Sequence, residues 1–174
     1  MAAIVRIGVA LAIPQPHASV LVGWRRAIGD PEADKIPPHV TLLPPTEFES
    51  DQLDLVEKHL AEVASTACPF TMRLAGTGTF RPVSQVVFVQ VSAGIAECEL
   101  LEGAVRQDPI QRELVYPYHP HVTVGHDIPD AQLDEAFRGL RDFVAQFAVD
   151  RFTMYSQDPD GSWQTHREFA LTGS

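Results

Sequence analysis

The sequence predicts an α+β fold built from a duplicated unit, with two lobes that meet across a shared cleft. Three observations support this prediction: one tetrapeptide occurs twice, other segments recur at the same spacing, and strand-like runs are mixed with helix-like ones. Many of the strand-like runs alternate partly between apolar and polar residues, which favours antiparallel pairing. No flexible linker separates the halves, so we expect one domain of residues 1–174 with lobes of about 1–82 and 83–174.

The repeated tetrapeptide is Pro-His-Val-Thr, and its two histidines, His39 and His121, are 121 − 39 = 82 residues apart. That spacing is close to half the chain. The other segments that match at this offset are Ile4–Val9 with Val86–Val91, and Phe70–Met72 with Phe152–Met154. Self-similarity at a fixed offset is the signature of a repeated structural unit.

Four segments have the apolar spacing of an amphipathic helix: His17–Ile28, Asp51–Ser65, Ile95–Gln107 and Asp130–Gln146. Each half of the chain is thus predicted as strand, helix, strand with the tetrapeptide, helix and strand. Near the end, Asp158-Pro159-Asp160-Gly161 predicts a hairpin turn in which the default role of Trp163 is packing.

The charge of the chain limits its partners. Its 13 Lys and Arg face 23 Asp and Glu, for a formal net charge of −10, and no basic run occurs. Because phosphate neutralisation drives the binding of long nucleic acids, we expect no such partner, although a small phosphorylated ligand needs only a few donors. No apolar segment is long enough to cross a membrane. The two cysteines, Cys68 and Cys98, match no metal or redox spacing, and reduced thiols in a cytoplasmic monomer are expected.

On a strand, residues two apart point to the same face. His39 therefore shares a face with Thr41, and His121 with Thr123, while the valine between them enters the core. Two facing imidazoles can act as base and acid, because imidazole titrates near neutral pH. The two threonine hydroxyls can donate hydrogen bonds to phosphate oxygens. This pattern predicts in-line displacement at phosphorus without a metal or other cofactor, and it leaves open which histidine is the base.

On these motifs, the sequence resembles the two-histidine (2H) phosphoesterase superfamily, the LigT-like family of RNA 2′,3′-cyclic phosphodiesterases and 2′-5′ RNA ligases. The resemblance covers nearly the whole chain. It implies a bilobal fold with a cleft between two antiparallel sheets and helices packed outside. It also implies catalytic histidines at His39 and His121 and hydroxyl ligands at Thr41 and Thr123. The implied ligand is a small nucleotide or a short RNA end that carries a cyclic phosphate.

Five further residues are candidates for substrate binding. The resemblance implies that Phe80 stacks on a base and Arg81 meets phosphate, unless they are a packed ring and a solvated cation. Tyr118, before the second motif, is expected at the cleft rim, and Tyr155 is a candidate to line the cleft. His126 stands where many members of the family have an arginine. It is either a weaker phosphate contact or a surface histidine, and we favour the surface histidine.

Three hypotheses of function and one of metal binding are left open. The first function is a metal-independent cyclic phosphodiesterase, and the second is an RNA 2′-5′ ligase, which the missing arginine and the acidic composition disfavour. The third is a binding module without catalysis, which the two intact motifs disfavour. His119, His121 and His126 lie close enough in sequence to suggest a metal site, but no carboxylate or cysteine completes a familiar ligand spacing. We therefore expect no metal.

Overall fold

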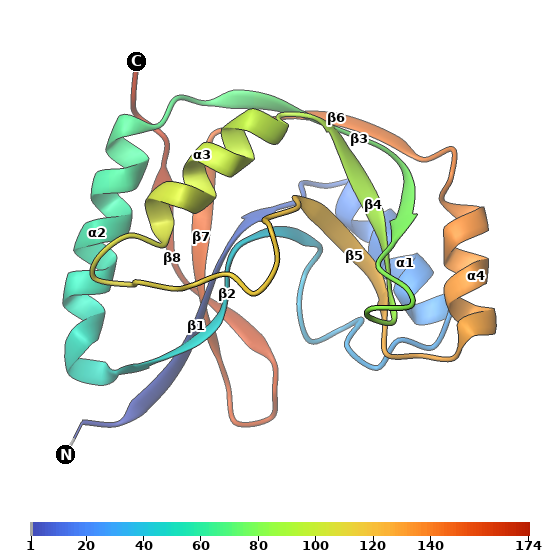
Figure 1. Ribbon diagram of the computed structural model, residues 1–174, viewed down its shortest axis with the longest axis horizontal. Coiled ribbons are helices and arrows are strands. Elements are labelled where there is room, and N and C mark those ends of the chain that lie inside the picture. The colour runs from blue at the N-terminus through green and yellow to red at the C-terminus, as the bar shows by residue number, and fades with distance from the viewer. Residues whose placement is uncertain (1) are drawn as a thin grey trace.

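The computed structural model describes residues 2–174. It contains four α-helices, one short 3₁₀ helix and eight strands, in an α+β arrangement (Figure 1). The helices are α1 (His17–Ala27), η1 (Ser50–Gln52), α2 (Leu53–Thr66), α3 (Ile95–Val105) and α4 (Asp130–Gly139). The strands are β1 (Ile4–Ala12), β2 (His39–Glu49), β3 (Phe70–Thr79), β4 (Val86–Ala93), β5 (His121–His126), β6 (Val144–Val149), β7 (Arg151–Gln157) and β8 (Trp163–Ala170).

The two expected sheets are the two halves of one curled antiparallel sheet. Its strand order is β6-β3-β4-β5-β2-β1-β7-β8. The halves join in the middle, where β2 and β5 are paired only through Val40 and Val122. These two residues are repeat mates, since 122 − 40 = 82. The strand order reads outward from this pair as β2-β1-β7-β8 on one side and β5-β4-β3-β6 on the other, so the sheet has pseudo-two-fold symmetry.

Each half of the sheet draws strands from both halves of the chain. The N-terminal strands β1 and β2 lie beside the C-terminal β7 and β8, and β3 lies beside β4, β5 and β6. The divisions 1–82 and 83–174 thus describe the sequence repeat, while each half of the sheet combines both segments. Helices α2 and α3 contact β8 and β2, and helices α1 and α4 contact β5 and its neighbours (Figure 1).

The strand pairing shows that the first strands of the two copies, β1 and β4, are not related by the offset of 82 residues predicted from the sequence. Ala12 pairs with His39 between β1 and β2, and Gln90 pairs with His121 between β4 and β5. Gln90 is therefore the counterpart of Ala12, at an offset of 90 − 12 = 78. Helices α1 and α3 begin at the same offset, since 95 − 17 = 78. Only the motif strands are related by 82.

The expected match of Ile4–Val9 with Val86–Val91 is thus four residues out of register. The apolar alternation of both strands allows this error, because a shift by an even number of residues keeps the same face inward. The four extra residues lie in the connection before the second motif, which runs over residues 106–120, against residues 28–38 in the first copy.

The match of Phe70–Met72 with Phe152–Met154 is out of register as well. Thr153 on β7 and Gly78 on β3 occupy equivalent places beside β1 and β4, at an offset of 153 − 78 = 75. The shared Phe-Thr-Met sequence therefore reflects two similar strands rather than equivalent residues.

Three of the four predicted helices are found, with ends within a few residues of the prediction, but the fourth is shorter than predicted. Helix α4 ends at Gly139, and residues from Val144 onward form β6, which pairs with β3 from Ala75–Val144 to Phe70–Val149. The helical spacing of apolar residues continues to Val144, but the segment from Val144 onward is a strand because the open edge of β3 offers it a ladder of backbone hydrogen bonds. The helical spacing there is a coincidence. The predicted hairpin near Gly161 is confirmed by β7 and β8.

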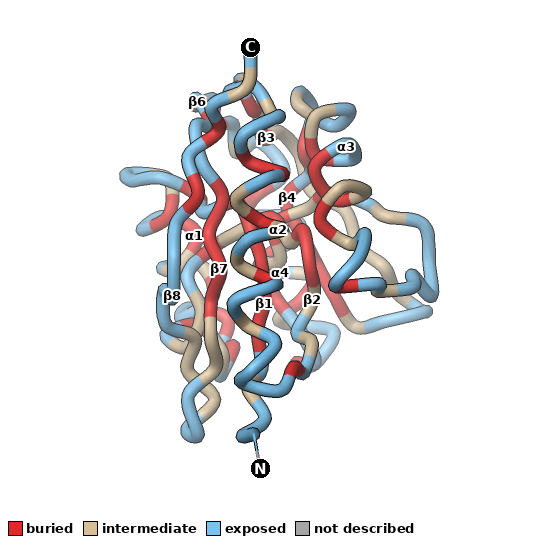
Figure 2. The backbone as a smooth tube through the Cα atoms, turned by 90° about the vertical axis from the view of Figure 1, so that its left-hand side faces the viewer, coloured by how far each residue is buried: buried red, intermediate tan, exposed pale blue. Residues whose placement is uncertain are grey.

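The apolar core lies between the sheet and the helices that cover it. Alternate strand residues point into it, such as Val9 and Leu11 on β1 and Val87 and Val89 on β4, all nearly inaccessible to solvent (Figure 2). The other face of the same strands is thereby left to line the concave side of the sheet. Within residues 2–174, no helix is long and apolar enough to span a membrane.

The end of α4 depends on the absence of a side chain at Gly139. A Cβ atom built there would lie 2.0 Å from the indole of Trp24 on α1, so this close approach of the two helices requires glycine. We expect Gly139→Ala to destabilise the fold by ~1–3 kcal/mol through overpacking. Gly103 on α3 is the matched control, since nothing lies within 4 Å of a Cβ there.

Gly103→Ala is expected to stabilise the fold slightly, by ~0.5–1 kcal/mol, because alanine favours helix. Urea unfolding of both variants and the wild type measures the two effects. Equal stabilities for the two alanine variants would contradict the packing argument.

Candidate functional site

The two tetrapeptides lie side by side at the centre of the sheet. Val40 and Val122 are fully buried and pair with each other, so the residues that flank them point to the concave face. The register set by this pair puts His39 across from Thr123 and Thr41 across from His121. Two imidazoles and two hydroxyls are thus gathered around one point of the concave face, each related to its counterpart by the pseudo-two-fold.

Both catalytic candidates are held in the same way. The Nδ1 atom of His39 lies 2.8 Å from the carbonyl oxygen of Pro37, and Nδ1 of His121 lies 2.6 Å from that of His119. Because a carbonyl oxygen only accepts, each Nδ1 must carry the proton and donate it. Each Nε2 is then left as the atom that can accept or deliver a proton at the cleft.

The proline of each tetrapeptide explains this tether. The accepting carbonyl belongs to the residue just before the proline, at Pro37 and at His119. A residue before proline is restricted to extended backbone, and proline fixes its own φ. The carbonyl therefore stays within reach of the ring two residues further on, which accounts for proline at this position in both copies.

Burial makes both imidazoles poor at holding a proton. The pKa of His39 is lowered from 6.5 to about 4, mainly by burial, which outweighs the opposing hydrogen bond to Pro37, with smaller contributions from the nearby Arg25 and His121. The pKa of His121 is also lowered, mainly by burial and to a lesser degree by the nearby His119. In the absence of a ligand, both rings are neutral at pH 7.

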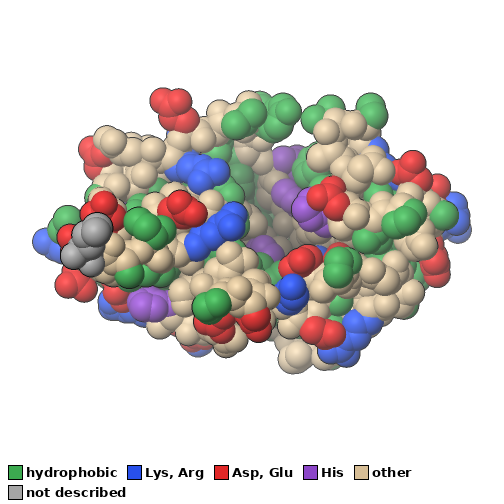
Figure 3. All heavy atoms as spheres, turned by 90° about the horizontal axis from the view of Figure 1, so that it is seen from below, with side chains coloured by type: hydrophobic (Ala, Val, Ile, Leu, Met, Phe, Trp, Pro, Cys, Tyr) green, Lys and Arg blue, Asp and Glu red, His purple; other side chains and the backbone are tan. Residues whose placement is uncertain are grey.

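The space beside the two histidines differs on the two sides. A cavity of about 680 Å³ lies on the His121 side, and one of only about 40 Å³ lies on the His39 side. Thr41 lines both cavities. Figure 3 shows histidine side chains gathered in a hollow whose walls carry apolar side chains. The motifs are symmetric, but the spaces that would receive a ligand are not.

Three of the predicted binding residues line these cavities. Phe80 lies edge-on to His121, with ring centroids 5.0 Å apart, and lines the larger cavity. Tyr118 lines the same cavity, and its hydroxyl donates a hydrogen bond of 2.7 Å to the carbonyl of Thr41, so its ring is fixed as a wall. Tyr155 lines the smaller cavity beside His39.

The other two predicted binding residues point elsewhere. The guanidinium of Arg81 lies 2.9 Å from a carboxylate oxygen of Asp134 and 3.3 Å from one of Asp130, both on α4. His126 is exposed at the end of β5, with Nε2 3.2 Å from a carboxylate oxygen of Asp127. Neither residue is among those that line the two cavities in the described part of the chain.

The fold brings to the cleft several residues that no sequence pattern places there. Arg112 lines the larger cavity and donates to Thr46 Oγ1 at 2.8 Å, because residues 106–120 fold back over β2. Glu102 on α3 lines the same cavity. Trp163 reaches the smaller cavity because the β7–β8 hairpin folds under β1, a position that hairpin chemistry alone does not reveal.

The histidines do not assemble a metal site. The rings of His119 and His121 are stacked at 6.0 Å, while His126 is paired with Asp127. Within residues 2–174, no group of three or more His, Cys, Asp or Glu residues has an arrangement that could hold a metal ion.

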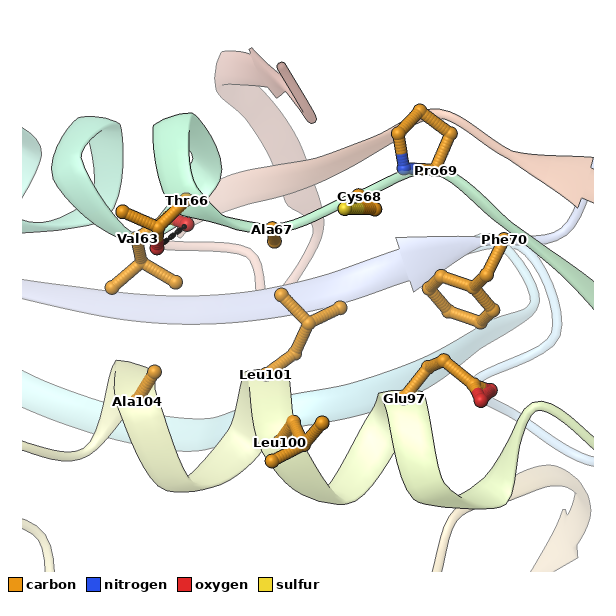
Figure 4. A pocket seen from close by; sticks show the side chains of 10 residues that line it. All are labelled: Val63, Thr66, Ala67, Cys68, Pro69, Phe70, Glu97, Leu100, Leu101 and Ala104. Carbon is orange, nitrogen blue, oxygen red and sulfur yellow. Dashed lines mark hydrogen bonds between the residues drawn. The ribbon is translucent and has the colours of Figure 1, made fainter. Parts of the chain in front are cut away.

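A third cavity, of about 390 Å³, lies away from both motifs between α2, α3 and the start of β3 (Figure 4). Its lining is mostly apolar, with Leu100, Leu101 and Phe70 among its residues, and Cys68 opens onto it. Cys68 is a free, exposed thiol and Cys98 is a free, buried one, so the two cysteines are not joined.

The family model and the curated relatives that match this chain agree on one family. A family model described as the 2′-5′ RNA ligase superfamily matches residues 13–161. A protein of Bacillus mycoides (strain KBAB4) named "putative phosphoesterase" is 32% identical over 144 residues, covering 82% of this chain and 83% of its own.

The solved structures that resemble the chain share its fold. The apo form of E. coli LigT superposes with a TM-score of 0.72 at 21% identity, over 98% of this chain and 99% of its own. E. coli LigT complexed with 3′-AMP gives a TM-score of 0.72 at 23% identity, again over 98% and 99%. The curled α+β arrangement is therefore that of LigT.

The lowered pKa of His39 predicts a loss of stability in mild acid. As pH falls from 7 toward 4, the unfolded chain takes up a proton on this ring near pH 6.5, and the folded chain does not until about 4. We expect His39 to account for ~1–2 kcal/mol of the stability lost between pH 7 and pH 5.

Urea unfolding of the wild type and of His39→Gln at the two pH values measures this contribution. The variant should lose less stability than the wild type. The control is His166→Gln, which removes a histidine on β8 whose Nε2 lies 3.5 Å from a carboxylate oxygen of Glu57, and it should not reduce the loss of stability on acidification. A His39→Gln variant with the same pH dependence as the wild type would show that the folded protein protonates His39 normally.

Proposed function

Since the chain belongs to the 2′-5′ RNA ligase superfamily, we propose that it is a phosphoesterase that hydrolyses small cyclic phosphodiesters, 2′,3′-cyclic phosphates above all. One observation carries the proposal. Two imidazoles with free Nε2 atoms, each tethered through Nδ1 to a carbonyl, flank the pair Val40–Val122 together with two threonines. Such a pair provides a base and an acid for one displacement at phosphorus.

The reaction follows from this arrangement. One neutral Nε2 takes a proton from a water molecule as its oxygen attacks phosphorus and forms a new P–O bond. The other imidazole, as imidazolium, gives its proton to the ribose oxygen whose P–O bond breaks. The hydroxyls of Thr41 and Thr123 donate hydrogen bonds to the non-bridging oxygens, where negative charge increases in the transition state. The product is a phosphomonoester, and the two histidines have exchanged protonation states.

The surroundings of the two rings favour one assignment of roles. The pKa of His39 is lowered to about 4, mainly by burial and in part by the charge of Arg25, so His39 is the ring that stays neutral and acts as base. His121 is then the acid. The anionic phosphate of a bound substrate raises the pKa of a ring that faces it, which allows His121 to carry its proton in the complex.

The relatives support a nucleotide as the substrate. Solved structures of E. coli LigT include complexes with 3′-AMP and with phosphate. The first is a nucleoside phosphomonoester, the class of product that a 2′,3′-cyclic phosphate gives. A small nucleotide or a short RNA end also suits a net charge of −10, which disfavours a long nucleic acid. We propose that the protein acts as a monomer in the cytoplasm.

The two alternatives have weaker support. A 2′-5′ ligase must hold two RNA ends, but His126 replaces the arginine of many relatives, and Arg81, the candidate to meet phosphate, is engaged by Asp130 and Asp134. A module that binds without reacting does not require two free Nε2 atoms.

Removal of either imidazole should abolish catalysis while the fold is kept. For His39→Ala and His121→Ala, we expect kcat on 2′,3′-cyclic nucleotides to fall by roughly a hundred- to ten-thousandfold, because each ring transfers a proton in the transition state. His166→Ala, on the exposed side of β8, is the control and should keep wild-type kcat. Full activity in either motif variant, or activity that a chelator removes, contradicts the mechanism.

The lowered pKa values also predict an acidic pH optimum. The base must be neutral and the acid protonated, so kcat/KM is expected to be highest between the two pKa values, which is between about 4 and 6.5. Above the pKa of His121 it should fall about tenfold per pH unit as that ring loses its proton. Initial rates from pH 4 to pH 9 measure the profile, and an optimum above pH 8 would contradict the burial of the two rings.

A further inference from the structure

The space on the His39 side of the cleft is small, and its floor is made of residues with little or no side chain. Gly8 and Ala10 of β1 line it together with His39 and Thr41. Ala10 pairs with Thr41 across the β1–β2 ladder, so this floor shares the concave face with the first motif. The volume is about 40 Å³. That is room for about one water molecule, which takes ~30 Å³ in the liquid.

The walls of this space come from three segments that are distant in the sequence. The half-buried indole of Trp163 covers Gly8, since a Cβ atom built on Gly8 would lie 3.5 Å from that ring. Tyr155 on β7 pairs with Gly8 and forms a second wall, and Ile36 forms a third. The backbone N–H of Trp163 donates a hydrogen bond of 2.8 Å to the carbonyl of Lys35. This bond fastens the β7–β8 hairpin to residues 28–38.

The two sides of the cleft therefore accept groups of different size. The nucleoside that carries the cyclic phosphate fits only the cavity of about 680 Å³ on the His121 side. The attacking oxygen must then approach phosphorus from the His39 side, next to the ring that takes its proton in the proposed mechanism. An alcohol that attacks from there needs space for the carbon atoms bonded to its oxygen, and Trp163 occupies that space.

Building on the proposed function, we propose that Trp163 is a specificity-determining residue that admits water as the attacking group and excludes alcohols, including the hydroxyl groups of RNA ends. When water attacks, its oxygen bonds to phosphorus and its proton passes to His39 Nε2. The ribose oxygen leaves with the proton of His121, and the product is a phosphomonoester. When an alcohol attacks, the same bonds form and break and the product is a phosphodiester. The same two histidines serve both reactions, and the walls of the small space select hydrolysis.

The test measures how one substrate is divided between two attacking groups. Adenosine 2′,3′-cyclic phosphate is opened in water that contains ethanol, and phosphorus NMR gives the ratio of ethyl phosphodiester to phosphomonoester. Free imidazole in the same solvent gives this ratio without walls. The wild-type ratio should be at least about tenfold lower, because a filled pocket discriminates by about ten- to two-hundredfold against one extra carbon. Both products come from one active site, so the ratio does not depend on the fraction of folded protein.

Trp163→Ala should raise the ratio about ten- to a hundredfold, toward the value for free imidazole. Trp163→Phe keeps a ring over Gly8 and should stay near the wild type. Ile36→Ala opens the same space from another segment and should also raise the ratio, which keeps the test valid if the hairpin variant does not fold. Tyr116→Ala is the matched control. It removes an exposed ring that lines the larger cavity and should leave the ratio unchanged.

Failure of this inference can be distinguished from failure of the proposed function. A wild type that forms the ethyl ester in the same ratio as free imidazole, or a Trp163→Ala variant with the wild-type ratio, overturns the role of Trp163 and leaves the phosphodiesterase in place. A ratio that rises as much in Tyr116→Ala as in Trp163→Ala also overturns it, because the attacking group then lies in the larger cavity. A wild type that opens no cyclic phosphate overturns both the proposed function and this inference.

Discussion

The site depends on one backbone pairing between two strands that are copies of each other. Val40 and Val122 join the two halves of the sheet, and each lies between a histidine and a threonine of its own motif. Because the pair lies on the pseudo-two-fold axis, it places the histidine and threonine of both motifs in equivalent positions. The strands are paired only there, so they can diverge on both sides and leave room for a ligand between the imidazoles. A longer ladder would close that space with backbone.

The chemistry of the imidazoles follows from the same placement. At the centre of a sheet they are shielded enough for burial to lower the pKa of both, to about 4 for His39. Their Nδ1 atoms are engaged by carbonyls that the prolines hold in place, so burial costs hydration without leaving a donor unsatisfied. Both rings can thus accept a proton at Nε2, and in the proposed mechanism the charge of the bound phosphate is what makes one of them an acid.

Strong local patterns in the sequence predict the motif strands, the positions of the four helices and the α+β class. What the sequence did not reveal was set by contacts between distant segments. Helix α4 stops at Gly139 because Trp24 packs there and β3 needs a partner strand. The guanidinium of Arg81 points to α4 and not into the cleft, because it forms ion pairs with two carboxylates there. Glu102 has the spacing of an ordinary helix residue, and only the fold of residues 106–120 makes it part of a cavity wall.

The duplication gives the protein the two histidines of the proposed catalytic pair, and the departures from symmetry make their surroundings unequal. Two identical lobes would bind a phosphodiester equally well in both orientations, and each histidine would serve as base and acid by turns. The second copy has a longer connection before its motif, and this connection encloses the larger cavity, while the first copy has Gly8 and Ala10 under a space of about 40 Å³. A ligand with one large end and one small end can then lie only one way. In the proposed mechanism, the four extra residues before the second motif, which change the offset from 82 to 78, are therefore the feature that separates the roles of the two histidines.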